Sequence, residues 1–563
     1  MPESWEQRAQ AKREAILAAI PQEWRIEHVP SVEEQVDVSG EYIRGFLHEK
    51  EVQITETDAE GIVEKTTKGE WSAEEVARAF CHRAALAHQL LHCLHEVFFD
   101  AAIEDARALD QYYRKHGKPI GPLHGLPISL KDQFHVKDVE TTMGYVGWIG
   151  TFEGKTGTGK EKVFESEIVK VLRKAGAVLY CKTSVPHTLM SGETVNNIIG
   201  YTLNGKNRRL TSGGSSGGEG ALIGVRGSPL GFGTDIAGSI RIPAAFNGLY
   251  GIRPSIGRLP YQGMATSMDG QNSILSVVGP LATTAGSLRL AVKTLLSSQP
   301  WLYDPLVHEI PWRDDQYREI RELANTVGSQ SKGRLCFGIL KTDGIVNPHP
   351  PIRRAIDLLV NALEKAGHEV VEWAPPPHKP ILDAAVATWI FDGGNDVKSA
   401  FALSGEPVAP QIGLFSNLTR ENTASEIAAV NVKLRQLRKK YLDYWVSTKD
   451  RQGGTGRPVD AVIAPLAPFA AARREMYTYY GYGTWVNALD VTSVIVPVTE
   501  VDKRVDVVES GYTPIDDTDK TVYESYDPEI YHGAHVSLQI VGRRLQEEKM
   551  LAIAEYVGKL IGK

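Results

Sequence analysis

Residues 211–260 read TSGGSSGGEGALIGVRGSPLGFGTDIAGSIRIPAAFNGLYGIRPSIGRLP, which combines more glycine and serine with fewer long charged side chains than any other stretch of the chain. Glycines surround Ser215 and Ser216 on both sides, and further glycines lead to Ser239. Glycine loses the most backbone entropy on folding, so such clusters mark backbone that takes positive φ or packs unusually closely. Serines set between them can be presented on sharp turns, with free N–H groups nearby.

Composition places the 563-residue chain among globular proteins, with 42% hydrophobic and 23% charged residues. A net charge of −7 argues against a nucleic-acid-binding surface, which normally carries a basic excess. The four cysteines show no CxxC spacing and indicate reduced thiols in an intracellular protein. There is no secretory signal pattern and no apolar run of the roughly 18 residues that a membrane span needs. These features predict a cytoplasmic protein without a membrane span.

Helical patterns alternate with short apolar segments along the chain, which predicts a mixed α/β sheet covered by helices on both faces. Ser4 with Gln7 and Ser72 with Glu75 have the spacing of helix capping boxes. Helices are expected over residues 4–20, 72–98, 284–297, 351–367, 424–447 and 545–561. Strands are expected over residues 128–131, 333–340, 368–374, 459–468 and 491–499, with a helix and then a parallel strand over 168–186, and a loop over 502–528.

Two local patterns suggest other chemistry. His88, His92 and His95 would lie on one face of the helix expected over 72–98, where they could hold a metal, although no further ligand completes the set. Residues 154–160, GKTGTGK, resemble a phosphate-binding loop but lack the following Ser or Thr and a preceding apolar strand. We therefore predict a surface loop at 154–160. We predict neither a bound metal nor a cofactor.

Amide or ester hydrolysis needs a nucleophile, a base and donors for the developing oxyanion. The stretch 211–260 supplies serines but contains no histidine, which excludes a Ser–His pair within it. GGSSGG contains GxSxG in two frames, yet the polar residues before it are not the apolar strand of a nucleophile elbow. A histidine from elsewhere in the chain remains an alternative base.

The segments GGSSGGE, GTDIAGSIRIPAA and GIRPSIGRLP resemble, in order and spacing, the motif of the amidase signature family of serine hydrolases. SWEQRAQAKREAILAAIPQEW near the N-terminus and YDPEIYHGAHVSLQIVGRRLQEEKMLAIAE near the C-terminus resemble the fungal acetamidase type. The resemblance implies an amidase signature fold, with a large mixed twisted β-sheet covered by helices. It further implies an N-terminal helical extension over 1–70, packed on a single amidase domain over 71–563.

By matching motif positions, the resemblance implies a Ser–cis-Ser–Lys triad of Lys131, Ser215 and Ser239. Ser239 would be the nucleophile, and Ser215 would relay its proton to Lys131. Lys131 must then be uncharged, which requires burial to lower its pKa from the ordinary value of ~10.4.

The backbone N–H groups of Ile236, Ala237, Gly238 and Ser239 are the implied oxyanion-hole donors. Ala237 stands where the family often has glycine, so this position must keep ordinary backbone geometry or carry strain.

Other residues are implied around the triad. Ser216, Asp235 and Arg241 either hold the loop by hydrogen bonds or act on the substrate. Met190 and Ser191 are expected on the acyl side of the cleft. Residues 388–398 and 479–485 either add aromatic walls to the cleft or pack in the core.

The implied function is an amidase that converts a carboxylic acid amide to the acid and ammonia or an amine through an acyl-enzyme. An acetamidase-like or broad specificity is expected, with a fatty acid or aryl amide hydrolase and a glutamyl-tRNA amidotransferase A-type subunit as alternatives. A non-catalytic scaffold is disfavoured because all three triad residues are present. The expected partner is a small-molecule amide, with no nucleic acid, and a homodimer is compatible with the sequence.

Overall fold

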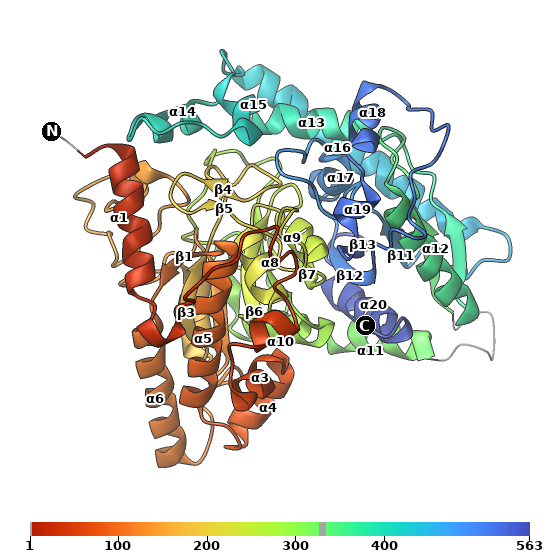
Figure 1. Cartoon of the computed structure of the whole chain (residues 1–563). Coiled ribbons are helices and arrows are strands. Elements are labelled where there is room, and N and C mark those ends of the chain that lie inside the picture. The colour runs from red at the N-terminus through yellow and green to blue at the C-terminus, as the bar shows by residue number, and fades with distance from the viewer. Residues whose placement is uncertain (1–2, 326–333) are drawn as a thin grey trace.

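The computed structural model describes residues 3–325 and 334–563, and its framework is a long mixed β-sheet (Figure 1). The strands are β1 (Leu94–Val97), β2 (Pro127–Lys131), β3 (Val178–Thr183), β4 (Val195–Asn196), β5 (Gly200–Tyr201), β6 (Leu230–Asp235), β7 (Tyr250–Arg253), β8 (Val277–Ala282), β9 (Cys336–Ile339), β10 (Glu369–Glu372), β11 (Ala461–Ala464), β12 (Ser493–Glu500) and β13 (His535–Val541). Within the described residues, eleven of them form one sheet in the order β1-β3-β2-β6-β8-β7-β12-β13-β11-β9-β10, while β4 and β5 pair separately.

Helices connect and cover these strands (Figure 1). They are α1 (Trp5–Ala18), α2 (Glu41–Arg44), α3 (Glu49–Thr55), α4 (Ala59–Thr67), α5 (Ala73–Leu91), α6 (Phe99–His116), α7 (Glu167–Lys174), α8 (Gly217–Gly224), α9 (Arg241–Phe246), α10 (Ala285–Ser297), α11 (Asp314–Asn325), α12 (Pro350–Lys365), α13 (Lys379–Trp389), α14 (Asn395–Ala402), α15 (Gly413–Ser416), α16 (Ala424–Ser447), α17 (Gly481–Leu489), α18 (Asp517–Glu524), α19 (Pro528–Tyr531) and α20 (Glu547–Leu560).

The sheet has a parallel group of strands on each side of an antiparallel middle, and β1 adds to one edge in the antiparallel direction. β2 pairs in parallel with β3 and β6, and β9 pairs in parallel with β10 and β11. Every residue of β2, β3, β6 and β8 is buried. Because successive side chains point to opposite faces, complete burial means that both faces of this part are covered. The predicted α/β fold class is confirmed, as is the parallel strand expected within 168–186.

Helix α1 packs on the protein's own surface through charged side chains. It begins with the predicted capping box, in which Ser4 and Gln7 each bond the other's backbone N–H. Lys12 lies between Glu96 and Glu140, with Nζ 2.5 Å from a carboxylate oxygen of each. Arg13 donates to the carbonyl oxygen of Ile198 (2.8 Å).

The helix expected over 72–98 is shorter than predicted. α5 ends at Leu91 because His92 takes a left-handed conformation with φ 55°, after which β1 pairs antiparallel with β3. His88 and His95 therefore do not share a helix face: His88 accepts the N–H of Leu94, and His95 bonds Thr142. Among the described residues, no group of three His, Cys, Asp or Glu side chains is arranged to hold a metal.

The structure also bears on the segments predicted over 502–528 and 333–340. The loop expected over 502–528 contains helix α18, whose N-cap Asp516 accepts the N–H of Asp519. The strand expected over 333–340 is β9, and position 333 lies outside the described residues.

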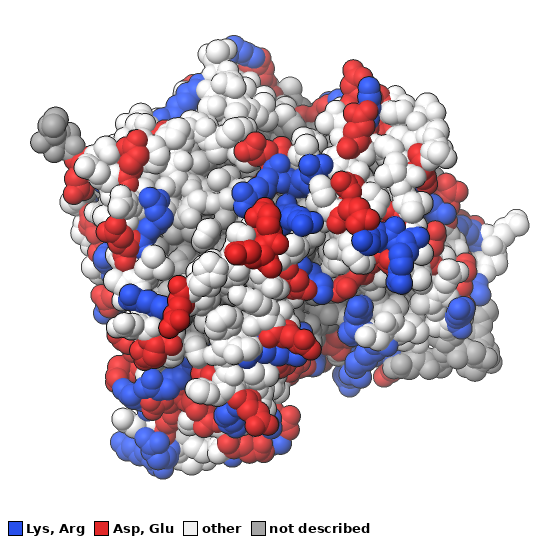
Figure 2. Space-filling view, in the orientation of Figure 1, with Lys and Arg blue, Asp and Glu red and all other residues white. Residues whose placement is uncertain are grey.

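The face shown in Figure 2 carries charges of both signs, with Lys and Arg side chains interspersed with Asp and Glu. Within residues 3–325 and 334–563, no helix has the length and apolar character needed to cross a bilayer.

We expect Lys12→Ala to loosen α1. Burial raises the pKa of Glu96 to about 7 even beside Lys12, so removing the ammonium leaves a buried carboxyl without its partner. The docking free energy of α1 should fall by about 3 kcal/mol, seen as faster hydrogen exchange at residues 5–18. Lys12→Arg, which keeps the charge, is the control. Unchanged protection in Lys12→Ala would contradict this role.

Candidate active site

Lys131 ends strand β2 and is completely buried. Its Nζ lies 2.7 Å from Ser215 Oγ and 2.8 Å from Thr234 Oγ1. Burial lowers the pKa of the Lys131 ammonium to about 7, although the charges of Asp235 and Glu219 act in the opposite direction. An uncharged amine at this position can accept a proton near neutral pH.

Thr234 and Gln133 orient the lysine amine. The Thr234 hydroxyl donates to Gln133 Oε1 (2.5 Å), and Gln133 Nε2 donates to the carbonyl of Ala265 (2.8 Å). A hydroxyl has one hydrogen, so Thr234 Oγ1 must accept a hydrogen from Lys131. The lone pair of the neutral amine is thereby left for Ser215.

The GGSSGG segment forms the tight turn before α8. The Gly214–Ser215 peptide bond is cis, and Gly213 has φ 85°. A Cβ at Gly214 would lie 2.4 Å from the carbonyl oxygen of Ser191, so only glycine allows this approach. Ser216 is buried and its hydroxyl has no hydrogen-bond partner among the described residues.

A buried carboxylate holds the turn that carries Ser239. Asp235 ends β6 and accepts the N–H groups of Gly238 (2.8 Å) and Ile240 (3.2 Å). Arg241 Nε lies 2.9 Å from the same carboxylate, and Asn487 donates to it at 2.8 Å. Burial alone would raise the pKa of Asp235, but the Arg241 charge and these hydrogen bonds lower it to about 2.

Arg241 extends this clamp to more distant elements. Its guanidinium donates to the carbonyl of Gly483 (3.2 Å) in α17 and to Gln539 Oε1 (3.0 Å) in β13. The two residues that flank the turn, Asp235 and Arg241, are therefore bonded to the loop backbone and to the neighbouring elements.

The turn backbone presents free N–H groups beside Ser239. Gly238 takes φ 127°, whereas Ala237 is not among the residues with positive φ, so the alanine keeps ordinary geometry. The N–H groups of Ile236, Ala237 and Ser239 make no hydrogen bond within the described chain. The Gly238 N–H differs from the prediction because it is occupied by Asp235.

Ser215 and Ser239 line the same small cavity. Within residues 3–325 and 334–563, no hydrogen bond joins their hydroxyl groups, but the Ser216 N–H donates to the Ser239 carbonyl (3.1 Å) and ties the two turns together. Met190, Thr234 and Ile236 contribute to the same cavity.

A larger apolar pocket adjoins Ser239 on the side of α13 and α15. Its walls combine the two predicted residues Met190 and Ser191 with aliphatic and aromatic side chains. The apolar and aromatic lining residues are Leu189, Ile236, Ile242, Leu382, Val386, Trp389, Leu414, Phe415, Tyr479 and Tyr480. Of the segments expected as aromatic walls, Trp389, Tyr479 and Tyr480 reach the pocket. Trp485 is instead buried against Tyr441 and His378.

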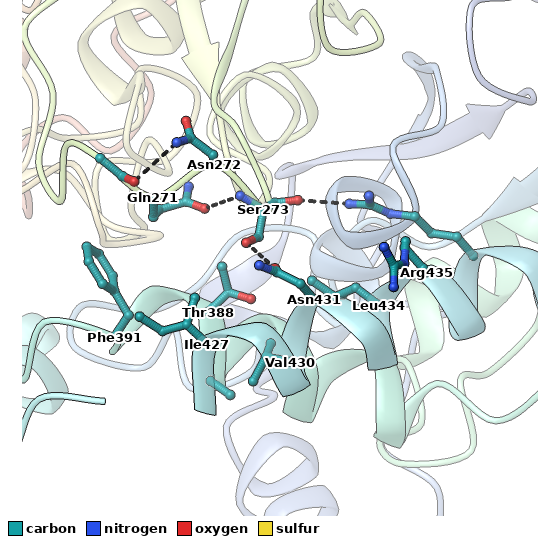
Figure 3. Close-up of a pocket in the computed structure, with 13 residues that line it drawn as sticks. Gln271, Asn272, Ser273, Thr388, Phe391, Ile427, Val430, Asn431, Leu434 and Arg435 are labelled. Carbon is teal, nitrogen blue, oxygen red and sulfur yellow. Dashed lines mark hydrogen bonds between the residues drawn. The ribbon is translucent and has the colours of Figure 1, made fainter. Parts of the chain in front are cut away.

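A separate pocket lies between residues 270–273 and helices α13 and α16 (Figure 3). Phe391 lines this pocket, together with Asn431, which bonds the Ser273 hydroxyl. Arg438 donates to the Ser273 carbonyl (3.0 Å). Thr388 and Phe391, from the segment expected as an aromatic wall, line this pocket, whereas the predicted triad, oxyanion-hole, acyl-side and turn-holding residues do not. These contacts anchor one end of the loop whose other end, at Ser267 and nearby residues, lines the cavity of the two serines.

Several site residues were missed by sequence reasoning. Thr234 lies within the quoted motif, but its contact with Lys131 joins positions 103 residues apart, which no local spacing reveals. The apolar residues of α13 and α15 have helical patterns that are indistinguishable from those of core helices.

Comparisons with known proteins agree with this architecture. The family model described as Amidase matches residues 75–551. An acetamidase of Emericella nidulans is 46% identical over 564 residues, covering 100% of this chain and 99% of that protein. An acetamidase of Aspergillus oryzae is 48% identical over 561 residues, covering 99% of each. A solved fatty acid amide hydrolase superposes with a TM-score of 0.89 at 32% identity, covering 99% of this chain and 95% of that one.

The fold and these matches define a hydrolase that acts on linear amides. The chain belongs to the amidase family, and its sheet and helices have the amidase signature fold.

We expect Gly483→Ala to disturb the turn at Ser239. A Cβ at Gly483 would lie 2.7 Å from the Ala237 carbonyl oxygen, so the loop must shift. Displacing catalytic groups by about 1 Å can cost about 10²-fold in kcat for amide hydrolysis. Gly413→Ala is the control, because a Cβ there meets only Asn417 at 3.7 Å. Equal kcat in both variants would show that the loop does not depend on this contact.

Proposed function

We propose that Ser239 is the nucleophile, Ser215 the proton relay and Lys131 the base of an amidase that forms an acyl-enzyme. The observation that carries this proposal is the buried Lys131 amine, 2.7 Å from Ser215 Oγ in the cavity that Ser239 also lines. A buried lysine with a lowered pKa beside a hydroxyl, at the edge of a cavity, has the features of a general base.

In the proposed reaction, Ser239 Oγ attacks the amide carbon while its proton passes to Ser215 and the Ser215 proton passes to Lys131. The carbonyl oxygen becomes an oxyanion, which the N–H groups of Ile236, Ala237 and Ser239 stabilise. The C–N bond then breaks as the ammonium of Lys131 returns a proton through Ser215 to the leaving nitrogen. Water hydrolyses the acyl-enzyme by the same route. Asp235 and Arg241 act by holding the turn. We assign Ser216 the same supporting role, without direct contact with the substrate.

For the substrate, we propose first a primary amide of a small carboxylic acid. The support is the identity of 46% and 48% to two acetamidases over essentially the full chain. The apolar pocket between α13 and α15 favours a second candidate, an amide with a longer aliphatic or aryl acyl group. Met190 and Ser191 would contact the acyl group in either case.

The remaining proposals concern the setting of the enzyme. All four cysteines are free thiols, which supports the proposed cytoplasmic location. The mixed charges in Figure 2 support a small molecule rather than nucleic acid as the partner. A homodimer stays a prediction.

A panel of primary amides from acetamide to long-chain and aryl amides tests both nucleophile and substrate. We expect Ser239→Ala to lower kcat/KM by about 10⁴-fold or more for every cleaved amide. Ser216→Ala, beside the relay rather than part of it, is the matched control. If Ser239→Ala kept the wild-type kcat/KM, Ser239 would not be the nucleophile. A kcat/KM that rises with acyl size, and falls in Trp389→Ala for large acyl groups only, would select the second candidate.

The lysine base fixes the pH dependence. Because the active form is the free amine, kcat/KM should rise about tenfold per pH unit below the Lys131 pKa of about 7 and level off above it. Lys131→Arg keeps a cation that does not lose its proton, so it should be inactive at every pH. A wild-type kcat/KM that stays constant or falls as the pH rises from about 5 to about 9 would rule out this base.

A further inference from the structure

Glu219 is a completely buried carboxyl that the mechanism above does not use. It extends from α8, the helix that follows Ser215, toward β2, which carries Lys131, and the adjacent β3. Its Oε2 lies 2.5 Å from Ser129 Oγ on β2, and its Oε1 lies 2.9 Å from Thr183 Oγ1 on β3. Thr183 is the strand neighbour of Lys131.

The hydrogen bonds around Glu219 require a count of hydrogens. Four oxygen–oxygen contacts of 3.0 Å or less form one chain: Thr183 with Glu219, Glu219 with Ser129, Ser129 with Ser228 (3.0 Å), and Ser228 with the Leu230 carbonyl (2.9 Å). The Leu130 carbonyl lies 3.5 Å from Thr183 Oγ1, beyond the usual length of a hydroxyl hydrogen bond, so the nearer Glu219 Oε1 takes the Thr183 hydrogen. Each contact needs one hydrogen, and the three hydroxyl groups supply three. An ionised Glu219 supplies none, which leaves one contact without a hydrogen.

A protonated Glu219 completes the chain. Thr183 then donates to Glu219 Oε1, Glu219 Oε2 donates to Ser129, Ser129 donates to Ser228, and Ser228 donates to the Leu230 carbonyl. Every contact has one hydrogen and every hydroxyl group donates once. An ionised carboxylate at this depth would also be removed from water, and no described cation forms a hydrogen bond or ion pair with it. Burying a charge in this way is costly.

The fold makes room for this carboxyl at Gly231. A Cβ at Gly231 would lie 1.9 Å from Glu219 Oε2 and 2.5 Å from Ser129 Oγ. The glycine in β6 therefore allows the Glu219–Ser129 contact, and the carboxyl is enclosed by β2, β3 and β6.

The charged and titratable groups around Glu219 are few. Lys131 on β2 is the cation whose charge acts on it. Tyr180, Cys181 and Cys93 are the other titratable groups that it influences, and burial raises the pKa of each of the three well above neutrality. Burial raises the pKa of Glu219 itself to about 8, against the hydrogen bonds from Ser129 and Thr183 and the charge of Lys131.

We propose that Glu219 is held as a neutral carboxylic acid that donates its hydrogen to Ser129, and that it acts as a positioning residue which leaves Lys131 an uncharged amine. The same number of protons would also allow a Glu219 carboxylate with a Lys131 ammonium, but the hydrogen count places the proton on the acid. The functional part of this proposal rests on Lys131 being the base proposed above.

Asp235 is the other acid whose charge favours the Lys131 ammonium. Its carboxylate is paired with Arg241, so its negative charge is balanced locally. Protonation of Glu219 would remove a negative charge near Lys131, just as Arg241 balances the negative charge of Asp235. Neither acid then presents an unbalanced negative charge to Lys131.

Infrared difference spectroscopy of the wild-type enzyme tests the protonation state without using activity. At pH 7, near the Lys131 pKa of about 7, we expect the carbonyl stretch of a buried carboxylic acid, lost in Glu219→Gln. In Ser129→Ala the band should remain but move to higher frequency, because the acid loses its hydrogen-bond acceptor. A carboxylate signal from Glu219 at this pH, in place of the acid band, would overturn the proposal.

The pH profile of Glu219→Gln supplies the second readout. The amide can donate to Ser129 and accept from Thr183, so kcat/KM should stay within about threefold of wild type. The acid limb of the profile should stay within about 0.3 pH unit, because no charge has been removed. If Glu219 were ionised, its loss would move the limb to lower pH by about one unit or more. An acid band, together with a kcat/KM profile that is the same in Lys131→Arg as in wild type, would count against the lysine base alone. It would leave the protonated Glu219 standing.

Discussion

The active-site turn depends on one buried ion pair, between Asp235 at the end of β6 and Arg241 at the start of α9. The carboxylate accepts backbone N–H groups from the turn, while the guanidinium bonds α17 and β13. A buried charge pair is stabilising only when its remaining donors and acceptors are also satisfied, and here they are used to bind the loop. The Ser239 turn is thus fixed to strands and helices that come from distant parts of the chain.

The second requirement is an amine that stays uncharged inside the protein. Strand β2 is buried along its whole length, which brings Lys131 into a medium that disfavours its ammonium. The Thr234–Gln133 chain then sets which way the amine points. Burial keeps the amine uncharged near neutral pH, and the Thr234–Gln133 chain orients it, so these two properties come from different contacts.

Much of this arrangement could be read from the sequence because it is local. The capping residues of α1 and α5, the apolar strand before Lys131 and the glycine-bounded serines all express short-range rules. The end of α5 was mispredicted because His92 adopts a left-handed conformation that glycine usually takes, in order to begin a strand paired with β3. The Thr234 contact and the pocket walls from α13 and α15 depend on long-range packing, which residue spacing does not encode.

The strand order has a consequence for how the chain is made. Within the described residues, β13 is the strand that connects β11, β9 and β10 to the rest of the sheet. Because β13 spans His535–Val541, a chain emerging from the ribosome carries two separate sheet fragments until that segment has been synthesised. Until then the backbone edges of β11 and β12 that pair with β13 lack their partner, so the two parts of the sheet can be joined only after every other described strand has been made.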